Sequence, residues 1–361
     1  MARARLTVGL LAGLTVAAML SVLFVLGART AWYVVPDFEF FYRAGQYVLA
    51  HAAVAPAGNV GYLPWYLPFL SRLFVAFALL PGCIGGLLWA GLNLLMLLGI
   101  LCWSGRHFNE APDHHWPASQ FIPFLLTFPY WIYQFRLNQL TTLVLVLCLA
   151  SLLLWESGRP WLAGVSAGLA VLIKTVPAVL VGWFVLKRQW RTAGGAVLTC
   201  AVLGPAADLA AFGPDSTISY YRRWYHQAIQ RGSARYFILN GVEVDHRNQA
   251  AGVTLGRLLH PINCQMRFWN DPRMSAVRGR AFTINLADLS APSVADLYRK
   301  WAIAVGVVLA WVLRCPAARL NRAVLRTEWS LILLAMLWFM PVLRLYHYAW
   351  GYPTLAMLCS H

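Results

Sequence analysis

A carboxylate that follows the first apolar run is the residue best placed to act as a base. Asp37 lies in the aromatic segment 35–45. Aromatic neighbours remove water from a carboxylate and raise its pKa, so it can accept a proton from an attacking hydroxyl group. Asp37 also follows Pro36 at the start of a predicted helix, residues 38–49, where aspartate is a common cap. The residues alone leave both roles open. Glu39 is a second carboxylate nearby, and a solvated surface position is its simpler explanation.

Lys174 is a cation in the middle of a long apolar run, residues 162–186, close to Pro177. An ionised side chain at the centre of a membrane costs about 2.5–3.5 kcal/mol on insertion scales, so it usually has a function. At ~1.5 Å per residue the amine is about 18 Å from either end of the run, too far for easy snorkelling. Pro177 can unwind the helix locally. We expect the ammonium group to hold an anion such as a phosphate.

Further cations lie near the ends of other apolar runs. Arg344 and His347 are three residues apart, so they share a helix face and can both donate hydrogen bonds to an anionic oxygen. An interfacial belt of Tyr, His and Arg explains these residues equally well. Arg72 lies before Pro81 in another run. It is either a buried functional cation or a side chain that reaches the membrane surface.

Two amides, Asn138 and Gln139, lie at the start of the apolar run 140–155. Capping or hydrogen bonding between helices explains such amides more simply than substrate contact does. The sequence has no Gly-rich phosphate loop, no HExxH, no GxSxG and no CxxC pair. We therefore expect neither a metal nor a cofactor. There is also no soluble nucleotide-sugar domain, so any sugar donor is expected to be attached to a lipid.

The composition indicates that these residues belong to a membrane protein. Of the 361 residues, 60% are hydrophobic and 12% are charged. A soluble domain carries about 25% charged residues. The net charge of +16 comes largely from basic residues in the connections between apolar runs. Membrane orientation and anionic lipids explain them better than nucleic acid does. We expect an all-α polytopic membrane protein that binds no nucleic acid.

Apolar runs divide the chain into about ten expected membrane helices within a single domain, residues 1–361. Roughly 18 or more apolar residues are enough to span a bilayer. The expected helices are residues 6–26, 62–80, 84–103, 118–133, 140–155, 162–186, 193–212, 298–313 and 329–345. We interpret the first as an uncleaved helix. Residues 348–359 are too short to span, so in this interpretation the chain stops inside a tenth helix.

Two polar connections, residues 27–61 and 213–297, are long. The second is far longer than usual, which marks it as functional or as a small subdomain. The second contains a predicted helix at residues 248–259, before Pro261. Lys and Arg favour the cytoplasmic side of a membrane. If the N-terminus is cytoplasmic, most of the basic residues that flank the runs fall inside. Both long connections are then expected on the periplasmic or extracellular face.

Four stretches, in order along the chain, resemble the membrane glycosyltransferases of family 87. They are residues 36–45 (PDFEFFYRAG) with 62–68 (YLPWYLP) and 79–81 (LLP), residues 138–139 (NQ), residues 158–190 around Lys174 and Pro177, and residues 248–259 (NQAAGVTLGRLL). The match at 138–139 departs from the order and spacing of the family pattern. The family's late Trp-Asp-His-Tyr motif is represented only by residues 345–348 (LYHY).

This resemblance implies a GT-C-type helical bundle with two long outer loops and a catalytic Asp in the first of them. It implies that Asp37 is the general base of an inverting transfer. The sugar, mannose-like or a pentose, would pass from a polyprenyl-phosphate donor to a lipid or cell-envelope glycan acceptor. Lys174, His347 and Arg344 would hold the donor phosphate without a metal. The remaining substrate contacts it suggests are Tyr42, Glu39, Gln139, Asn248, Gln249 and Arg257.

Two other interpretations stay open at the level of sequence. A transporter or flippase of lipid-linked saccharides would use Lys174 and Arg72 as translocation charges and would not need Asp37 as a base. An inactive homologue would explain the missing Trp-Asp pair and the short C-terminal run.

Overall fold

The computed structural model is built from helices. It describes residues 2–29, 36–51, 66–108, 116–241, 244, 247–262 and 283–359, and within these ranges it contains no strand. The prediction of an all-α fold is therefore confirmed for the described part of the chain. The segment 62–65 of the second aromatic motif lies outside the described residues.

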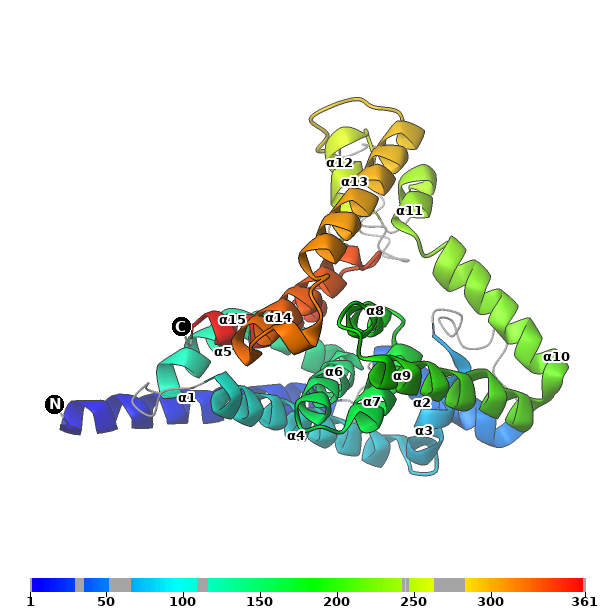
Figure 1. Ribbon diagram of the computed structural model, residues 1–361. Helices are drawn as coiled ribbons and strands as arrows, with labels where there is room; N and C mark the ends of the chain where they lie inside the picture. Colours follow the sequence, from blue (N-terminus) through cyan, green and yellow to red (C-terminus); the bar gives the residue numbers. More distant parts are fainter. Residues whose placement is uncertain are drawn as a thin grey trace, which may run out of the picture.

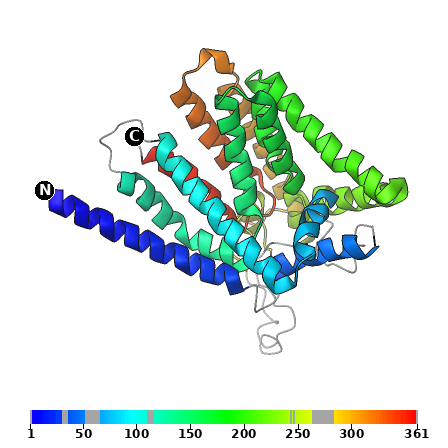
Figure 2. The same ribbon diagram turned by 90° about the horizontal axis from the view of Figure 1, so that it is seen from below.

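The first half of the chain forms helices that pack against one another. They are α1 (Ala2–Ala28), α2 (Pro36–His51), α3 (Pro68–Ala78), α4 (Gly82–Phe108), α5 (Trp116–Leu137), α6 (Thr141–Glu156), α7 (Pro160–Ile173), α8 (Ala178–Leu186) and α9 (Trp190–Ala201). In Figures 1 and 2, α1, α4 and α5 run side by side, and α6, α7 and α9 continue the layer.

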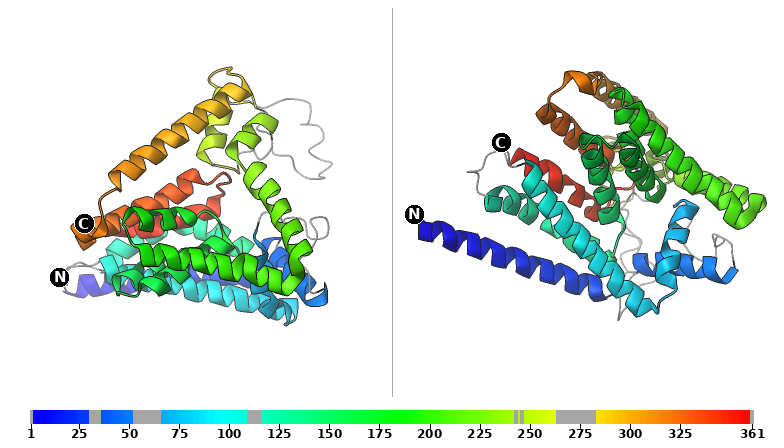
Figure 3. Two further views of the ribbon diagram at one scale, coloured as in Figure 1. Left: turned by 45° about the vertical axis from the view of Figure 1, so that its right-hand side comes forward. Right: turned by 60° about the horizontal axis from the view of Figure 1, so that its bottom comes forward.

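The second half leaves this layer and returns to it. A π-helical turn (Val202–Ala206) leads into α10 (Ala207–Trp224), which runs away from the layer to α11 (Ala234–Asn240) and α12 (Ala251–Leu259). From there α13 (Ala291–Val312) comes back towards α14 (Arg322–Phe339). In the left view of Figure 3, α10, α13 and the layer of the first half outline a triangle. A 3-10 turn (Leu345–Trp350) and α15 (Gly351–Leu358) then pack on α14 and α5.

Fewer helices qualify as membrane spans than the sequence led us to expect. Among the described residues, Gly82–Gly105 and Trp190–Gln230 are long and apolar enough to cross a membrane. A third span would be the pair Gln120–Leu137 and Thr141–Glu156, which is bent by 118°. The structure thus supports a membrane protein with two or three clear spans, while the figure of about ten stays a prediction.

Several predicted runs differ from the helices that form. The run at 162–186 is broken into α7 and α8, which confirms the expected unwinding before Pro177. Helix continues past residue 213, through the bend at Gly213, to Gln230. The start of the connection predicted at 213–297 is therefore helical. The predicted helices at 38–49 and 248–259 form as α2 and α12.

Close packing in the first layer depends on glycines. A Cβ atom at Gly164 of α7 would clash with the carbonyl oxygen of Thr192 in α9, and a Cβ at Gly45 of α2 would clash with the carbonyl of Phe74 in α3. The two helix pairs can approach so closely only because these positions lack a side chain.

An aromatic cluster fixes α2 on its neighbours. Phe41 of α2 lies 5.3 Å from Phe74 of α3, and Phe74 lies 5.1 Å from Trp89 of α4, measured between ring centroids. All three side chains are buried. Buried aromatic pairs add stability beyond the area they bury. They hold α2, and with it Asp37 in its first turn, in a defined position.

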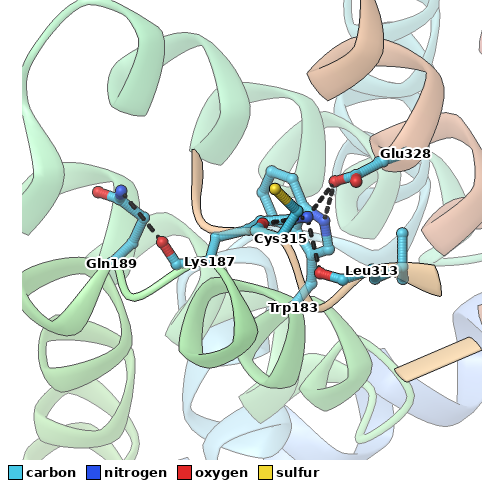
Figure 4. A network of polar contacts seen from close by, with 6 residues as sticks. All are labelled: Trp183, Lys187, Gln189, Leu313, Cys315 and Glu328. Carbon is cyan, nitrogen blue, oxygen red and sulfur yellow. Dashed lines mark hydrogen bonds and ion pairs between the residues drawn. The ribbon is translucent and has the colours of Figure 1, made fainter. Parts of the chain in front are cut away.

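A buried ion pair joins α8 to α14 (Figure 4). The Lys187 ammonium lies 2.5 Å from the Glu328 carboxylate and donates to the carbonyl oxygens of Leu313 and Cys315 at 2.7 and 2.8 Å. The Trp183 indole also donates to Glu328 at 3.3 Å. The Lys187 side chain is completely buried, with a charged partner.

Candidate active site

A sharp elbow between α5 and α6 lies at the centre of the predicted site. The helices end at Leu137 and begin again at Thr141, and they are bent by 118°. Asn138 makes the turn with a φ of +50°, in the left-handed region that asparagine tolerates better than most residues. This elbow, residues 138–141, carries the two amides that the sequence singled out.

Hydrogen bonds with four elements fix the elbow. The Asn138 amide donates to the carbonyl of Gly27 in α1 at 3.1 Å, and the Trp89 indole of α4 donates to the Asn138 carbonyl at 2.9 Å. The Gln134 amide of α5 donates to the Gln139 carbonyl at 2.6 Å. Trp350, at the end of the 3-10 turn, donates to the Thr141 carbonyl at 3.0 Å. Backbone groups freed by the helix break are thus satisfied, as buried groups must be.

Asp37 faces the elbow from the first turn of α2. The Gln139 amide donates a hydrogen bond to its Oδ2 atom. Burial raises the pKa of the Asp37 carboxyl above its ordinary value, while the Gln139 hydrogen bond and the charges of Lys174 and Arg344 oppose the rise. A desolvated carboxylate of this kind is suited to accept a proton. The alternative role, a helix cap, is compatible with its position in the first turn.

Lys174 faces the elbow from the other side. It terminates α7 in an extended conformation, with φ and ψ of −140° and 134°. Its ammonium group donates to the Thr141 hydroxyl at 3.3 Å and lies 2.9 Å from the Nε2 atom of His347. It also stands 5.4 Å from the centre of the Tyr346 ring, a favourable cation–π distance. The break before Pro177 is therefore what brings this amine to the site.

His347 and Arg344 come from the 3-10 turn after α14. His347 is 3% exposed, and its Nδ1 atom accepts a hydrogen bond from the Arg344 backbone N–H at 3.0 Å. Arg344 is half-buried and close enough for its charge to act on both Asp37 and His347. His347 thus meets Lys174 although 173 residues separate them along the chain.

These contacts form one polar line across the elbow. It runs from Asp37 to Gln139, passes along the backbone to Thr141, and continues through Lys174 to His347. A base at one end and a group of cations at the other can remove a proton from a nucleophile and stabilise an anionic leaving group. Among the described residues, no three His, Cys, Asp or Glu side chains gather in a metal-binding cluster.

Asn248 and Gln249 contact the backbone beside the 3-10 turn. Oδ1 of Asn248 accepts from the Leu343 N–H at 3.0 Å, and its amide donates to the Pro341 carbonyl at 3.3 Å. The Gln249 N–H donates to the Leu343 carbonyl at 2.8 Å. These bonds position the segment that leads into Arg344. Contact of Asn248 and Gln249 with a substrate stays a prediction.

Three other predicted contacts have partners outside the polar line. Glu39 forms an ion pair of 2.5 Å with Arg43, and the Tyr42 hydroxyl donates to the Leu80 carbonyl at 2.7 Å. Arg257 is buried on α12 and donates to Thr254 at 2.9 Å. Their role in substrate binding stays a prediction.

Arg72 lies in a separate ion pair. Its guanidinium group is 2.8 Å from the fully buried carboxylate of Asp208 in α10, and it also donates to the Leu203 carbonyl. The Tyr221 hydroxyl donates to the same carboxylate at 2.8 Å. This arrangement ties α3 to α10 and accounts for a cation within an apolar helix.

Sequence reasoning missed several residues that build the site. Thr141, Tyr346 and Trp350 contact Lys174 or the elbow, and none of them has a side chain that stands out by type. One usable signal was position, because Thr141 follows Gln139 by two residues at the start of an apolar run.

Comparison with known proteins gives one match. Residues 62–276 match the sequence model of glycosyltransferase family 87, which is more than half of the chain. The range includes Gln139, Lys174 and Asn248 and leaves out Asp37 and His347. No curated protein and no solved structure matches the chain. On the strength of the family match, the chain belongs to glycosyltransferase family 87.

Proposed function

We propose that this membrane glycosyltransferase moves a sugar from a polyprenyl-phosphate donor to a lipid or cell-envelope glycan acceptor. The sugar is mannose-like or a pentose, and its anomeric configuration is inverted. The observation that supports this most is the polar line from Asp37 to His347, because it pairs a base with cations suited to a phosphate. The family gives the general activity.

The proposed reaction is a single displacement. An acceptor hydroxyl oxygen attacks the anomeric carbon and gives its proton to the Asp37 carboxylate. The bond between that carbon and the phosphate oxygen breaks, and the electron pair leaves with the polyprenyl phosphate. Lys174, His347 and Arg344 donate hydrogen bonds to the departing phosphate, which stabilises charge as it develops. One displacement at one carbon inverts its configuration.

A large apolar groove supports a lipid-linked donor. Its volume is about 1010 Å³, and it lies among α5, α12, α13, α14 and α15. Tyr348 lines it and is the chain neighbour of His347, and Gln249 lines it beside Leu343. An isoprenoid chain is the kind of ligand that an apolar groove binds, since burial of its surface in place of water is favourable.

The proposed orientation places the N-terminus in the cytoplasm and the site on the periplasmic or extracellular face. It rests on the distribution of Lys and Arg between the apolar runs. Lys187 and Glu328 would then lie near the cytoplasmic side, at the opposite end of α8 from Lys174.

Replacement of Asp37 by Asn tests the proposal. The purified Asp37→Asn variant should bind polyprenyl phosphate normally and lose sugar transfer by about 10²–10⁴-fold, the usual contribution of a general base. Transfer from polyprenyl-phosphate mannose and polyprenyl-phosphate pentose would be measured with extracted envelope lipids as acceptors. A transporter of lipid-linked saccharides would keep much of its activity, and that result would reject the proposal.

A further inference from the structure

Two residues of the elbow contact the two halves of the proposed site. Gln139 donates to the carboxylate of Asp37, and Thr141 accepts a hydrogen bond from the ammonium group of Lys174. Only Leu140 separates them, and it is fully buried. The base and the phosphate-binding cation come from α2 and the end of α7, yet both are held by one segment of three residues.

The segment itself has little freedom to move. Asn138, Gln139 and Thr141 are at most 3% exposed. Their carbonyl oxygens accept from Trp89, Gln134 and Trp350 respectively, each from a different element or turn. A backbone whose carbonyls are all fixed by buried donors keeps its side chains in one orientation.

We propose that the elbow sets the separation and relative orientation of the general base and the donor-phosphate cation, with Gln139 and Thr141 as the positioning residues of the two halves. This inference rests on the proposed glycosyl transfer. A displacement reaction needs the base and the leaving group on opposite sides of one carbon atom. Misplacement of a reacting group by about 1 Å can cost about 10²-fold in rate.

The two positioning residues act on different steps. Gln139 stabilises the ionised form of Asp37, so its removal raises the pKa of that carboxyl further. Thr141 gives Lys174 an acceptor that aims the amine towards His347. Its removal weakens the hold on the phosphate and leaves the base unchanged.

Three single variants of the full-length protein, purified in lipid nanodiscs, test this division. They are Gln139→Met, Thr141→Val and the control Thr142→Val. Thr142 is the next residue, is fully buried, and its hydroxyl has no hydrogen-bond partner among the described residues. Each valine or methionine keeps the approximate volume of the side chain that it replaces.

Each variant has its own expected result. In Gln139→Met the acid limb of the kcat/KM profile moves to higher pH and kcat falls by about 10²-fold, while affinity for polyprenyl phosphate is kept. In Thr141→Val the affinity for polyprenyl phosphate falls by about tenfold, and the acid limb stays in place. Thr141→Ser restores the affinity. Thr142→Val changes neither quantity.

Other outcomes overturn the inference. If Thr142→Val reproduces either loss, packing rather than positioning is responsible. If Gln139→Met leaves the acid limb in place, the role given to Gln139 is wrong. If Thr141→Val binds polyprenyl phosphate normally, the role given to Thr141 is wrong. Both conclusions hold even when Asp37→Asn is inactive. If Gln139→Met does not fold, the same measurements are made on Gln139→Asn, because its shorter amide cannot reach Asp37. Full transfer by Asp37→Asn would instead reject the proposed function, so the two failures are distinguishable.

Discussion

The Nζ atom of Lys174 lies 2.9 Å from the Nε2 atom of His347. Because Nδ1 of His347 accepts the backbone N–H of Arg344, the proton of the imidazole is on Nε2. That N–H points at the lysine nitrogen, which must use its lone pair to accept it. An ammonium group has no lone pair for this N–H, so the contact with His347 is made by the uncharged amine form of Lys174, while the ammonium form keeps its hydrogen bond to Thr141.

Binding of a phosphate should favour the charged, ammonium form of Lys174. Phosphate oxygens accept hydrogen bonds from both side chains, so the lysine nitrogen takes up a proton when the donor binds. Affinity for polyprenyl phosphate should then fall as pH rises from 7 to 9, by up to about tenfold per pH unit. Binding titrations in nanodiscs across this range would measure it. The dependence should be weaker in His347→Gln, and equal slopes in the two proteins would contradict the assignment.

The pH dependence of the reaction should report the Asp37 carboxyl. Its ionised form is the base, and burial raises its pKa above the ordinary value of 3.8. The rate therefore rises as the pH increases through that raised pKa, and it is low at pH values under the pKa. The charge of Lys174 lowers the pKa of Asp37, so Lys174→Gln should raise that pKa and move the acid limb of the kcat/KM profile to higher pH. A profile that stays flat down to pH 4 would show that another group is the base.

The ion pair between Lys187 and Glu328 should contribute to stability more than surface pairs do. Lys187→Met leaves a mostly buried carboxylate without its cation. We expect this to lower the free energy of unfolding by about 3–5 kcal/mol, the usual cost of breaking a buried pair. Lys187→Met combined with Glu328→Leu should recover much of the loss. Thermal unfolding in detergent would compare these variants with Lys300→Met, which removes an exposed pair with Asp296 and should cause no measurable change. Equal unfolding temperatures for Lys187→Met and the unmodified protein would contradict this.

Helix packing between α7 and α9 offers a matched pair of glycines. Gly164→Ala should destabilise the protein by about 1–3 kcal/mol, because its methyl group meets the Thr192 carbonyl. Gly194 lies in α9 of the same helix pair, and a methyl group added there has no atom within 4 Å. Gly194→Ala should be neutral or slightly stabilising, since alanine favours helix. Chemical unfolding of both proteins would detect the difference, and two equally stable variants would argue against the close approach.

Local helices were predictable from local patterns. The aromatic stretch after Pro36 and the stretch before Pro261 formed as α2 and α12 because each carries its own apolar face and a proline at one end. Bends that depend on tertiary contacts were not predictable. The gap between the expected helices 118–133 and 140–155 anticipated the break at the elbow but not its sharp bend, for which the signal is a single residue, Asn138, able to adopt positive φ.

The charged residues of the candidate site were predictable because charge is rare in apolar runs. Lys174, Arg344 and His347 stood out for that reason, and the structure brings Lys174 and His347 into contact. Thr141 and Trp350 could not be found in this way, since hydroxyl and indole groups are common in membrane helices. Arg72 also stood out as a basic residue, whereas Lys187 did not, and each has a carboxylate partner from a distant element. Sequence distance hid these pairings.

The left-handed turn at Asn138 restricts how the gene for this protein can change. Adding or deleting one residue in the elbow would rotate the start of α6 by about 100°, since a helix has 3.6 residues per turn. Thr141 would then face away from Lys174, and Trp350 would lose its carbonyl acceptor at the same time. Descendants of this sequence can exchange one side chain for another at the elbow step by step. They cannot vary its length, so insertions and deletions should be purged there while the long connections accumulate them.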